Sequence, residues 1–278
     1  MTLVHSLLRQ RHNYYRGLLI VEALALIFLR LLEQAPQLVS LVYLLIGGVA
    51  VLMDSPLLPQ HRLTPQLRTS VIPQKDHHRL QQAIRRRRWM QYGWLSAAGV
   101  ELLWQLSLLL APVVAVQLSV LHIAVWLALM LYVLWCLMGA LAEEPVFNGA
   151  LLMGAAAGYL LVGFTGGILL NSLLVVDPEA FVLSGTAHSD LPTAISYAPQ
   201  MLGAAFGSLT TLGSAMLNEK SLTSVSASTG ITIVGQLYVA ILIAGVLGKP
   251  RQIAAVRKAA HSARRGKPPS PRLRRIRR

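Results

Sequence analysis

The feature that most constrains this chain is a series of long apolar runs. Six stretches of about 18 to 25 residues have this character, at 17–33, 36–53, 92–114, 118–141, 147–173 and 222–247. Such runs match the helix length needed to cross a hydrocarbon core of roughly 30 Å. Lipid offers no hydrogen-bond partner to an open backbone, so the runs should be helical. The sequence therefore predicts an all-α integral membrane protein with six transmembrane helices.

Basic residues set the expected orientation. They gather before residue 17, in the connection 54–91 and after Gly248, and they account for most of the net charge of +14. Lysine and arginine in short loops resist translocation, so these regions should stay on the cytosolic side. Six spans with an internal N-terminus place all three regions there. We expect a multi-pass protein of the cell membrane with its N- and C-termini in the cytosol.

A further apolar segment, 196–216, lies between the last two runs and is too short and broken to cross a bilayer. Such a segment is tolerated at membrane depth only when protein surrounds it or it lines a water-filled cavity. We expect a re-entrant helix at roughly 197–210, with Pro199 in its first turn, followed by an extended stretch. The negative end of its dipole would then face the middle of the membrane and favour a cation.

The stretch Ser208-Leu209-Thr210-Thr211-Leu212-Gly213 resembles the S/T-L-T-T-V/L-G signature of the potassium-channel pore family. Gly235 follows nineteen residues after Met216, where the inner helix of that family usually has its hinge glycine. The run from Gly235 to Ala244 is similar to inner helices of small bacterial potassium channels. The resemblance covers about 146–248. It implies a homotetramer with a pore helix and selectivity filter between spans five and six.

The resemblance also implies the ion-binding residues, which are Thr210, Thr211, Leu212, Gly213, Ser214 and Ala215. Backbone carbonyls of Thr211, Leu212 and Gly213 would hold a dehydrated monovalent cation, potassium or sodium, and no other cofactor is expected. The family's G-Y-G-D is Gly213-Ser214-Ala215-Met216 here. A β-carbon at Ala215 disfavours the conformation that glycine permits, and Ser214 lacks the bracing aromatic ring. We therefore expect reduced potassium selectivity.

The expected organisation follows from these features. A cytosolic N-terminus at 1–16 precedes a four-helix scaffold at 17–141, which contains the basic loop 54–91. A pore module at 142–248 follows. The chain then continues as a basic, largely disordered cytosolic tail at 249–278, whose first half extends the inner helix. The fourth run contains no arginine, so it is not a voltage sensor.

Two expectations concern partners. A cluster of basic residues precedes the third run and can bind anionic lipid, or can act only as a topology signal; its members are Lys75, Arg79, Arg85, Arg86, Arg87 and Arg88. The segment from Lys75 to Trp94 could lie along the inner leaflet. No aromatic residues interleave the basic tail, so nucleic acid is not expected as a partner.

Ionisable residues inside apolar runs are costly and usually face protein. Glu101 and Arg30 fall at comparable depths, which predicts a buried pair that fixes helix packing; the alternative is a proton or ion relay that also involves Glu22 and His122. Gly154 and Gly158 form a small-residue face suited to close helix contact.

We expect a cation channel rather than an enzyme, because the spans contain no H-E-x-x-H motif and no evident serine–histidine pair. The altered filter leaves a non-conducting or regulatory membrane subunit of the same fold as the alternative. A secondary transporter is a third possibility, although it predicts a second copy of the broken segment among the first four runs.

Overall fold

The computed structural model of the chain describes residues 2–53, 74–143, 149–183 and 193–265, and within these all the regular elements are helices. The elements are α1 (Thr2–Ile27), α2 (Leu29–Gln34), α3 (Leu38–Met53), α5 (Gln74–Leu110), α6 (Pro112–Glu143), α7 (Gly149–Val176), the 3₁₀ turn η1 (Pro178–Ala180), α8 (Thr193–Ser196), α9 (Ala198–Leu209) and α10 (Leu222–Arg265). The described residues contain one isolated antiparallel bridge, between Phe181 and Leu217. The predicted all-α class is confirmed.

Within the residues that the structure describes, four helices are long and apolar enough to cross a membrane. Their candidate spans are Arg88–Leu110, Val113–Leu141, Leu151–Val176 and Leu222–Ala244. These correspond to the last four of the six predicted runs. The second run forms α3, whose 16 residues reach only about 24 Å. The first run is divided at Phe28, between the end of α1 and the start of α2.

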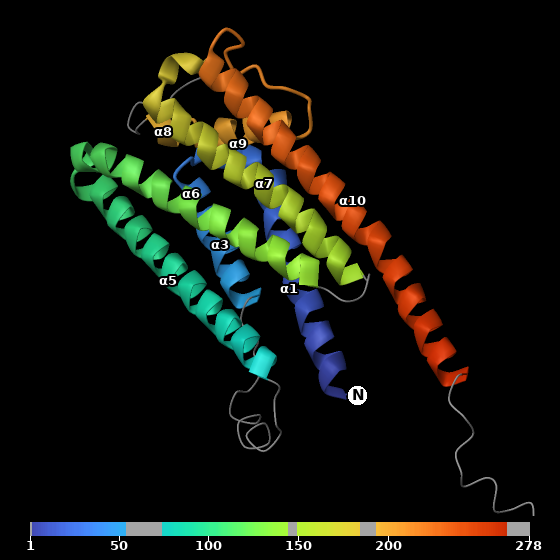
Figure 1. The fold of residues 1–278 in the computed structure, drawn as a ribbon. Coiled ribbons are helices and arrows are strands. Elements are labelled where there is room, and N and C mark those ends of the chain that lie inside the picture. The colour runs from blue at the N-terminus through green and yellow to red at the C-terminus, as the bar shows by residue number, and fades with distance from the viewer. Residues whose placement is uncertain (1, 54–73, 144–148, 184–192, 266–278) are drawn as a thin grey trace, which may run out of the picture.

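The helices run lengthwise through one elongated bundle (Figure 1). The start of α1, the start of α5 and the far end of α10 lie at one end of it. The turn between α5 and α6 lies at the opposite end, together with η1, α8 and the start of α10. The segments flanking the three basic regions are thus gathered at one end, as the charge pattern predicts.

Helix α7 lies at the centre, where it contacts α1, α6, α9 and α10. Its glycines allow these close approaches. A β-carbon at Gly158 would overlap the Tyr238 side chain of α10, and one at Gly163 would overlap Phe206 of α9. At Gly154, the neighbours are Leu141 and Tyr15. The small-residue face noted in the sequence therefore packs against helices of the same chain.

Two helices extend well beyond their predicted spans. The basic segment from residue 74 continues directly into the span of α5, so it prolongs that helix rather than forming a separate one along the membrane surface. Helix α10 continues to Arg265, which makes the first half of the predicted tail helical. The remainder of that tail, 266–278, and residues 54–73 of the basic loop lie outside the described residues.

Candidate functional site

The short helix predicted at 197–210 is present as α9, Ala198–Leu209, with proline in its first turn. Eight of its residues are buried: Ala198, Pro199, Met201, Leu202, Ala204, Ala205, Ser208 and Leu209. It contacts α7, α10 and α2. A helix of this length that is buried on most of its surface owes its stability to packing rather than to its own propensity.

The carbonyl groups at the end of α9 are fully used. The last four carbonyls of a helix lack intrahelical partners, and here each of them has another donor. Gly207 accepts from the Gly213 amide at 3.0 Å, and Phe206 accepts from the Thr210 amide at 3.0 Å. Ser208 accepts from the Thr232 hydroxyl of α10 at 2.8 Å. Leu209 accepts from the Tyr159 hydroxyl of α7 at 3.2 Å.

Tyr159 and Thr232 thus fix the end of α9 from both neighbouring helices, and a third contact joins Ser208 to Ser228 at 3.0 Å between their hydroxyl oxygens. The sequence reasoning missed these residues. The signal that could have found them is a hydroxyl group inside an apolar span, since such groups usually have a protein partner there.

The predicted ion-binding residues form a tight exposed loop after α9. Thr210, Thr211, Leu212, Gly213 and Ala215 are exposed, with Leu212 reaching 86%, and Ser214 is half-buried. Thr211 and Gly213 have positive φ angles, 62° and 75°. Glycine adopts this region freely, whereas a β-branched residue there is strained. The chain therefore folds the loop away from its own core and holds it in a turned conformation.

The carbonyl groups of this loop do not all fit the predicted ion site. Among the described residues, no hydrogen bond uses the carbonyl oxygens of Thr211, Leu212 or Gly213. The Gly213 oxygen nevertheless points at Gly207, where an added β-carbon would overlap it. In the single chain this oxygen faces α9 rather than open space. The turned, partly closed loop thus differs from the extended stretch expected from the sequence.

Helix α10 borders the loop with two distinct faces. The predicted hinge residue Gly235 is buried against α9, and a β-carbon there would overlap the end of the Leu209 side chain. Three polar residues, Ser226, Thr229 and Gln236, are exposed on the remaining surface of the span. Polar groups within a span usually face water or protein.

The segment after the loop is tied to the connection that follows α7. The Val182 amide donates to the Met216 carbonyl at 2.8 Å, and the Asn218 amide donates to the Ala180 carbonyl at 3.1 Å. Glu179 and Glu219, two of the acids in this connection, are exposed. Another, Asp190, lies outside the described residues.

A second polar group, absent from the predicted sites, lies among α3, α5 and α6. Glu101 is buried and accepts hydrogen bonds from Ser40 at 2.7 Å, Gln105 at 2.9 Å and Trp126 at 3.1 Å. Its other close partner is His122, at 2.7 Å between Oε2 and Nε2. The predicted pairing of Glu101 with Arg30 is therefore wrong, and Arg30 is exposed. Glu101 of α5 is paired instead with His122 of α6.

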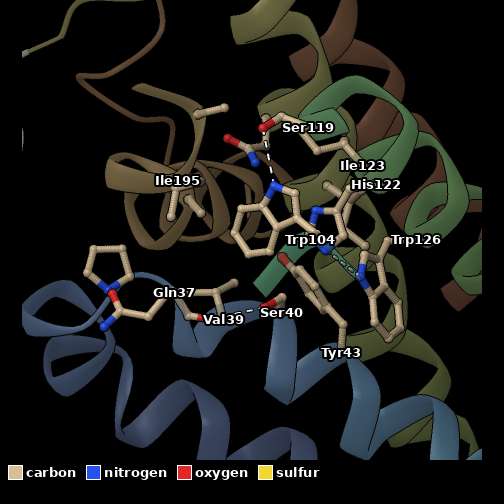
Figure 2. A pocket seen from close by; sticks show the side chains of 15 residues that line it. Gln37, Val39, Ser40, Tyr43, Trp104, Ser119, His122, Ile123, Trp126 and Ile195 are labelled. Atoms are coloured by element: carbon tan, nitrogen blue, oxygen red, sulfur yellow. Dashed lines mark hydrogen bonds between the residues drawn. The ribbon is translucent and has the colours of Figure 1, made fainter. Parts of the chain in front are cut away.

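A cavity opens beside His122 (Figure 2). The centres of water molecules can occupy a volume of about 40 Å³ in this cavity. A volume of about 10–15 Å³ of this kind is enough to hold one water molecule. Its walls come from α3, α5, α6, α7, α8 and the start of α9, through residues that include Tyr43, Trp104, His122, Asn171, Ile195 and Ala198. The cavity thus connects the four-helix part of the chain with α9.

The predicted lipid-binding residues Lys75, Arg79 and Arg85 to Arg88 all lie in α5. Arg85 and Arg88 are exposed. Lipid binding by these residues stays a prediction.

Comparisons of the chain with protein-family descriptions, with characterised proteins and with solved structures found no match.

Proposed function

We propose that four copies of this chain form a cation channel of the cell membrane, with reduced potassium selectivity and without voltage sensing. In this proposal α1 with α2, α3, α5, α6, α7 and α10 are the six spans, both termini are cytosolic, and α9 is the pore helix. The loops from Thr210 to Ala215 meet on the common axis. Gly235 serves as the hinge of the inner helix.

The observation that carries the proposal is the exposed loop Thr210–Gly213 at the end of a buried helix, held between two candidate spans. The exposed polar residues Ser226, Thr229 and Gln236 of α10 suit a water-filled path. Together with the motif and its spacing to Gly235, they favour copies arranged around a pore.

The test of architecture and conduction uses the purified full chain. We expect detergent-solubilised particles with fourfold symmetry, in which residues 196–216 converge on the axis. In planar bilayers with potassium on one side and sodium on the other, we expect a current that reverses short of the ideal potassium potential. A reversal at the ideal value would refute the loss of selectivity, and particles without fourfold symmetry would refute the channel.

Cysteine substitution tests the pore surface of α10 directly. The sole native cysteine, Cys136, is buried and gives little background labelling. A charged, water-soluble thiol reagent should modify Thr229→Cys and block the current. Leu103→Cys, on the exposed apolar face of α5, should stay unmodified because that face contacts lipid in this proposal. Equal labelling of the two variants contradicts the assignment of α10 to the pore.

The loop geometry supports a second candidate, a non-conducting subunit of the same fold. The Gly213 carbonyl faces Gly207, and the positive φ of Thr211 breaks the extended course that a row of carbonyl ligands requires. In this case fourfold particles would carry no current under any potassium or sodium gradient. Co-purification with a second pore protein from the native membrane would support a regulatory role.

A further inference from the structure

We propose that the cavity beside His122 is a proton-binding site, in which the imidazole takes up a proton from water and signals its charge to α9. The proton site itself does not depend on channel activity. Its effect on current rests on the proposed function.

The hydrogen bonds around Glu101 determine where the proton adds. The Glu101 carboxylate has four polar neighbours, the Ser40 hydroxyl, the Gln105 amide, the Trp126 indole and His122 Nε2. Oε1 accepts from Ser40 and Gln105, and Oε2 accepts from Trp126. In the arrangement that we propose, Glu101 is ionised and His122 Nε2 carries the hydrogen that joins the two side chains. The Trp126 indole, which is also 3.1 Å from Nε2, then donates to Glu101 alone. The second ring nitrogen, Nδ1, is left with its lone pair.

No hydrogen bond among the described residues uses His122 Nδ1, and His122 lines the cavity. A hydronium ion in the cavity can pass its proton to this nitrogen and leave as water. The product is an imidazolium that donates from both nitrogens. One proton and one positive charge are added to the site, and no other bond changes.

The surroundings stabilise that added charge. Glu101 lies 2.7 Å from the opposite ring nitrogen. The Trp104 indole stacks on the imidazole with ring centres 4.3 Å apart and planes within 5° (Figure 2). An aromatic face attracts a cation through its quadrupole. The site is thus arranged to hold a protonated ring.

The other groups that line the cavity bring no competing charge. Tyr43 of α3 and the neutral Asn171 of α7 line the cavity. Glu101 of α5 contacts His122 but does not line the cavity. The lining residues Ala194, Ile195 and Ala198 of α8 and α9 are apolar.

Asn171 gives the route by which protonation reaches α9. Its side-chain oxygen is buried without a hydrogen-bond partner among the described residues, and the residue lines the same cavity. A protonated Nδ1 becomes a donor, and rotation of the Asn171 amide would bring its oxygen, now out of contact with water, within reach of a bridging water. Helix α7, which carries Asn171, packs directly on α9.

The cavity lies close to the turn between α5 and α6. Trp104 lies six residues before the end of α5, and Ser119 lies seven residues after the start of α6. At 1.5 Å per residue, the cavity is roughly 10 Å from the turn that joins these helices. The expected orientation places this turn on the external side.

Intrinsic fluorescence of the full chain in lipid nanodiscs tests the proton site. Protonated imidazole quenches an adjacent indole, so emission should fall as the pH is lowered from 8.5 to 4.5. His122→Gln should abolish the fall. Trp104→Phe should shrink it, because the stacked reporter is lost. Trp135→Phe is the matched control, since Trp135 lies on α6 with His122 but has a side chain that is 73% exposed, and it should leave the fall unchanged.

Glu101→Gln adds a measurement that does not rely on His122 variants folding. Without the carboxylate, the midpoint of the fluorescence titration should move to lower pH. Emission that is independent of pH in the parent protein would overturn the proposal. A fall that persists unchanged in Trp104→Phe but disappears in Trp135→Phe would do the same.

Current recordings test the coupling to α9. We expect the current to depend on the pH of the external chamber with the same midpoint as the fluorescence, and this dependence should vanish in His122→Gln. A pH-independent current beside titrating fluorescence would overturn the coupling and leave the proton site intact. If no current is seen under any condition, the channel proposal fails while the fluorescence result still decides the proton site.

Discussion

Gly207 and Gly213 contact each other through their backbones, at the point where α9 turns into the exposed loop. The Gly213 amide donates to the Gly207 carbonyl at 3.0 Å, and the Gly213 carbonyl oxygen occupies the space that a β-carbon on Gly207 would need. The loop is therefore closed against the helix end by two residues that lack side chains. This relationship depends on glycine at position 207.

Gly207→Ala should open the loop. Backbone cannot move aside as a flexible side chain can, so the substitution should cost about 1–3 kcal/mol, as overpacking typically does. The apparent melting temperature in detergent should fall, and the current should be lost. Gly203→Ala is the matched control on the same helix, because its β-carbon would meet only the Leu29 side chain at 3.7 Å. The control should be neutral or stabilising by up to about 1 kcal/mol. Equal effects would contradict the backbone contact.

Thr211→Gly should stabilise the chain. A threonine at φ 62° is strained, and glycine relieves a cost on the order of 1–2 kcal/mol. Thr210 has an ordinary φ of −89°, so Thr210→Gly should instead destabilise by about 0.5–1 kcal/mol through added chain entropy. Melting temperatures of the two variants check the opposite signs.

Strain of this kind is often kept at functional sites. We therefore expect Thr211→Gly to change the current or its selectivity despite higher stability. A stabilised variant with the parent's conduction would remove Thr211 from the ion path.

The helices were predictable because the apolar runs and the helix-start proline are local features. Residues 198–209 form α9 within one residue of the predicted 197–210.

The partner of Glu101 was not predicted, because comparable depth in the membrane does not show which helix faces give contact. Glu101 lies ten residues before Ala111 and His122 lies eleven after it. In an antiparallel pair joined at Ala111 they fall opposite each other. The predicted runs end at 114 and begin at 118, so the turn was expected several residues later and the pair was not predicted.

The conformation of the loop after α9 also could not be predicted from the sequence. The motif indicates which residues follow α9, but the direction of each carbonyl depends on tertiary contacts from Tyr159, Thr232 and Gly207. These contacts join positions far apart in the chain. The family motif does not specify these tertiary contacts, and this sequence departs from the motif at Ser214 and Ala215.

Thr232→Val should loosen the end of α9. The Thr232 hydroxyl donates to the Ser208 carbonyl at 2.8 Å, which links α10 to α9. Its loss should cost about 1–3 kcal/mol, because that carbonyl is left with one donor fewer in a buried place. Thr229→Val on the exposed surface is the matched control, since both changes keep a β-branched residue in the helix. A melting temperature lowered only in Thr232→Val is expected, and a larger loss in Thr229→Val would contradict it.

The two buried glutamates should respond in opposite directions to the same substitution. Glu22 is fully buried, and neither of its carboxylate oxygens has a hydrogen-bond partner among the described residues. Replacing an unsatisfied buried polar group by an apolar one removes a desolvation cost of about 1–3 kcal/mol, so Glu22→Met should raise the melting temperature. Glu101→Met should lower it, because the substitution leaves His122, Ser40 and Trp126 without their acceptor. Breaking one side of such a buried pair typically costs about 3–5 kcal/mol.

If Glu22→Met lowers the melting temperature instead, Glu22 has a stabilising partner. If it raises the melting temperature and abolishes the current, the carboxyl group has been retained at the expense of stability for conduction.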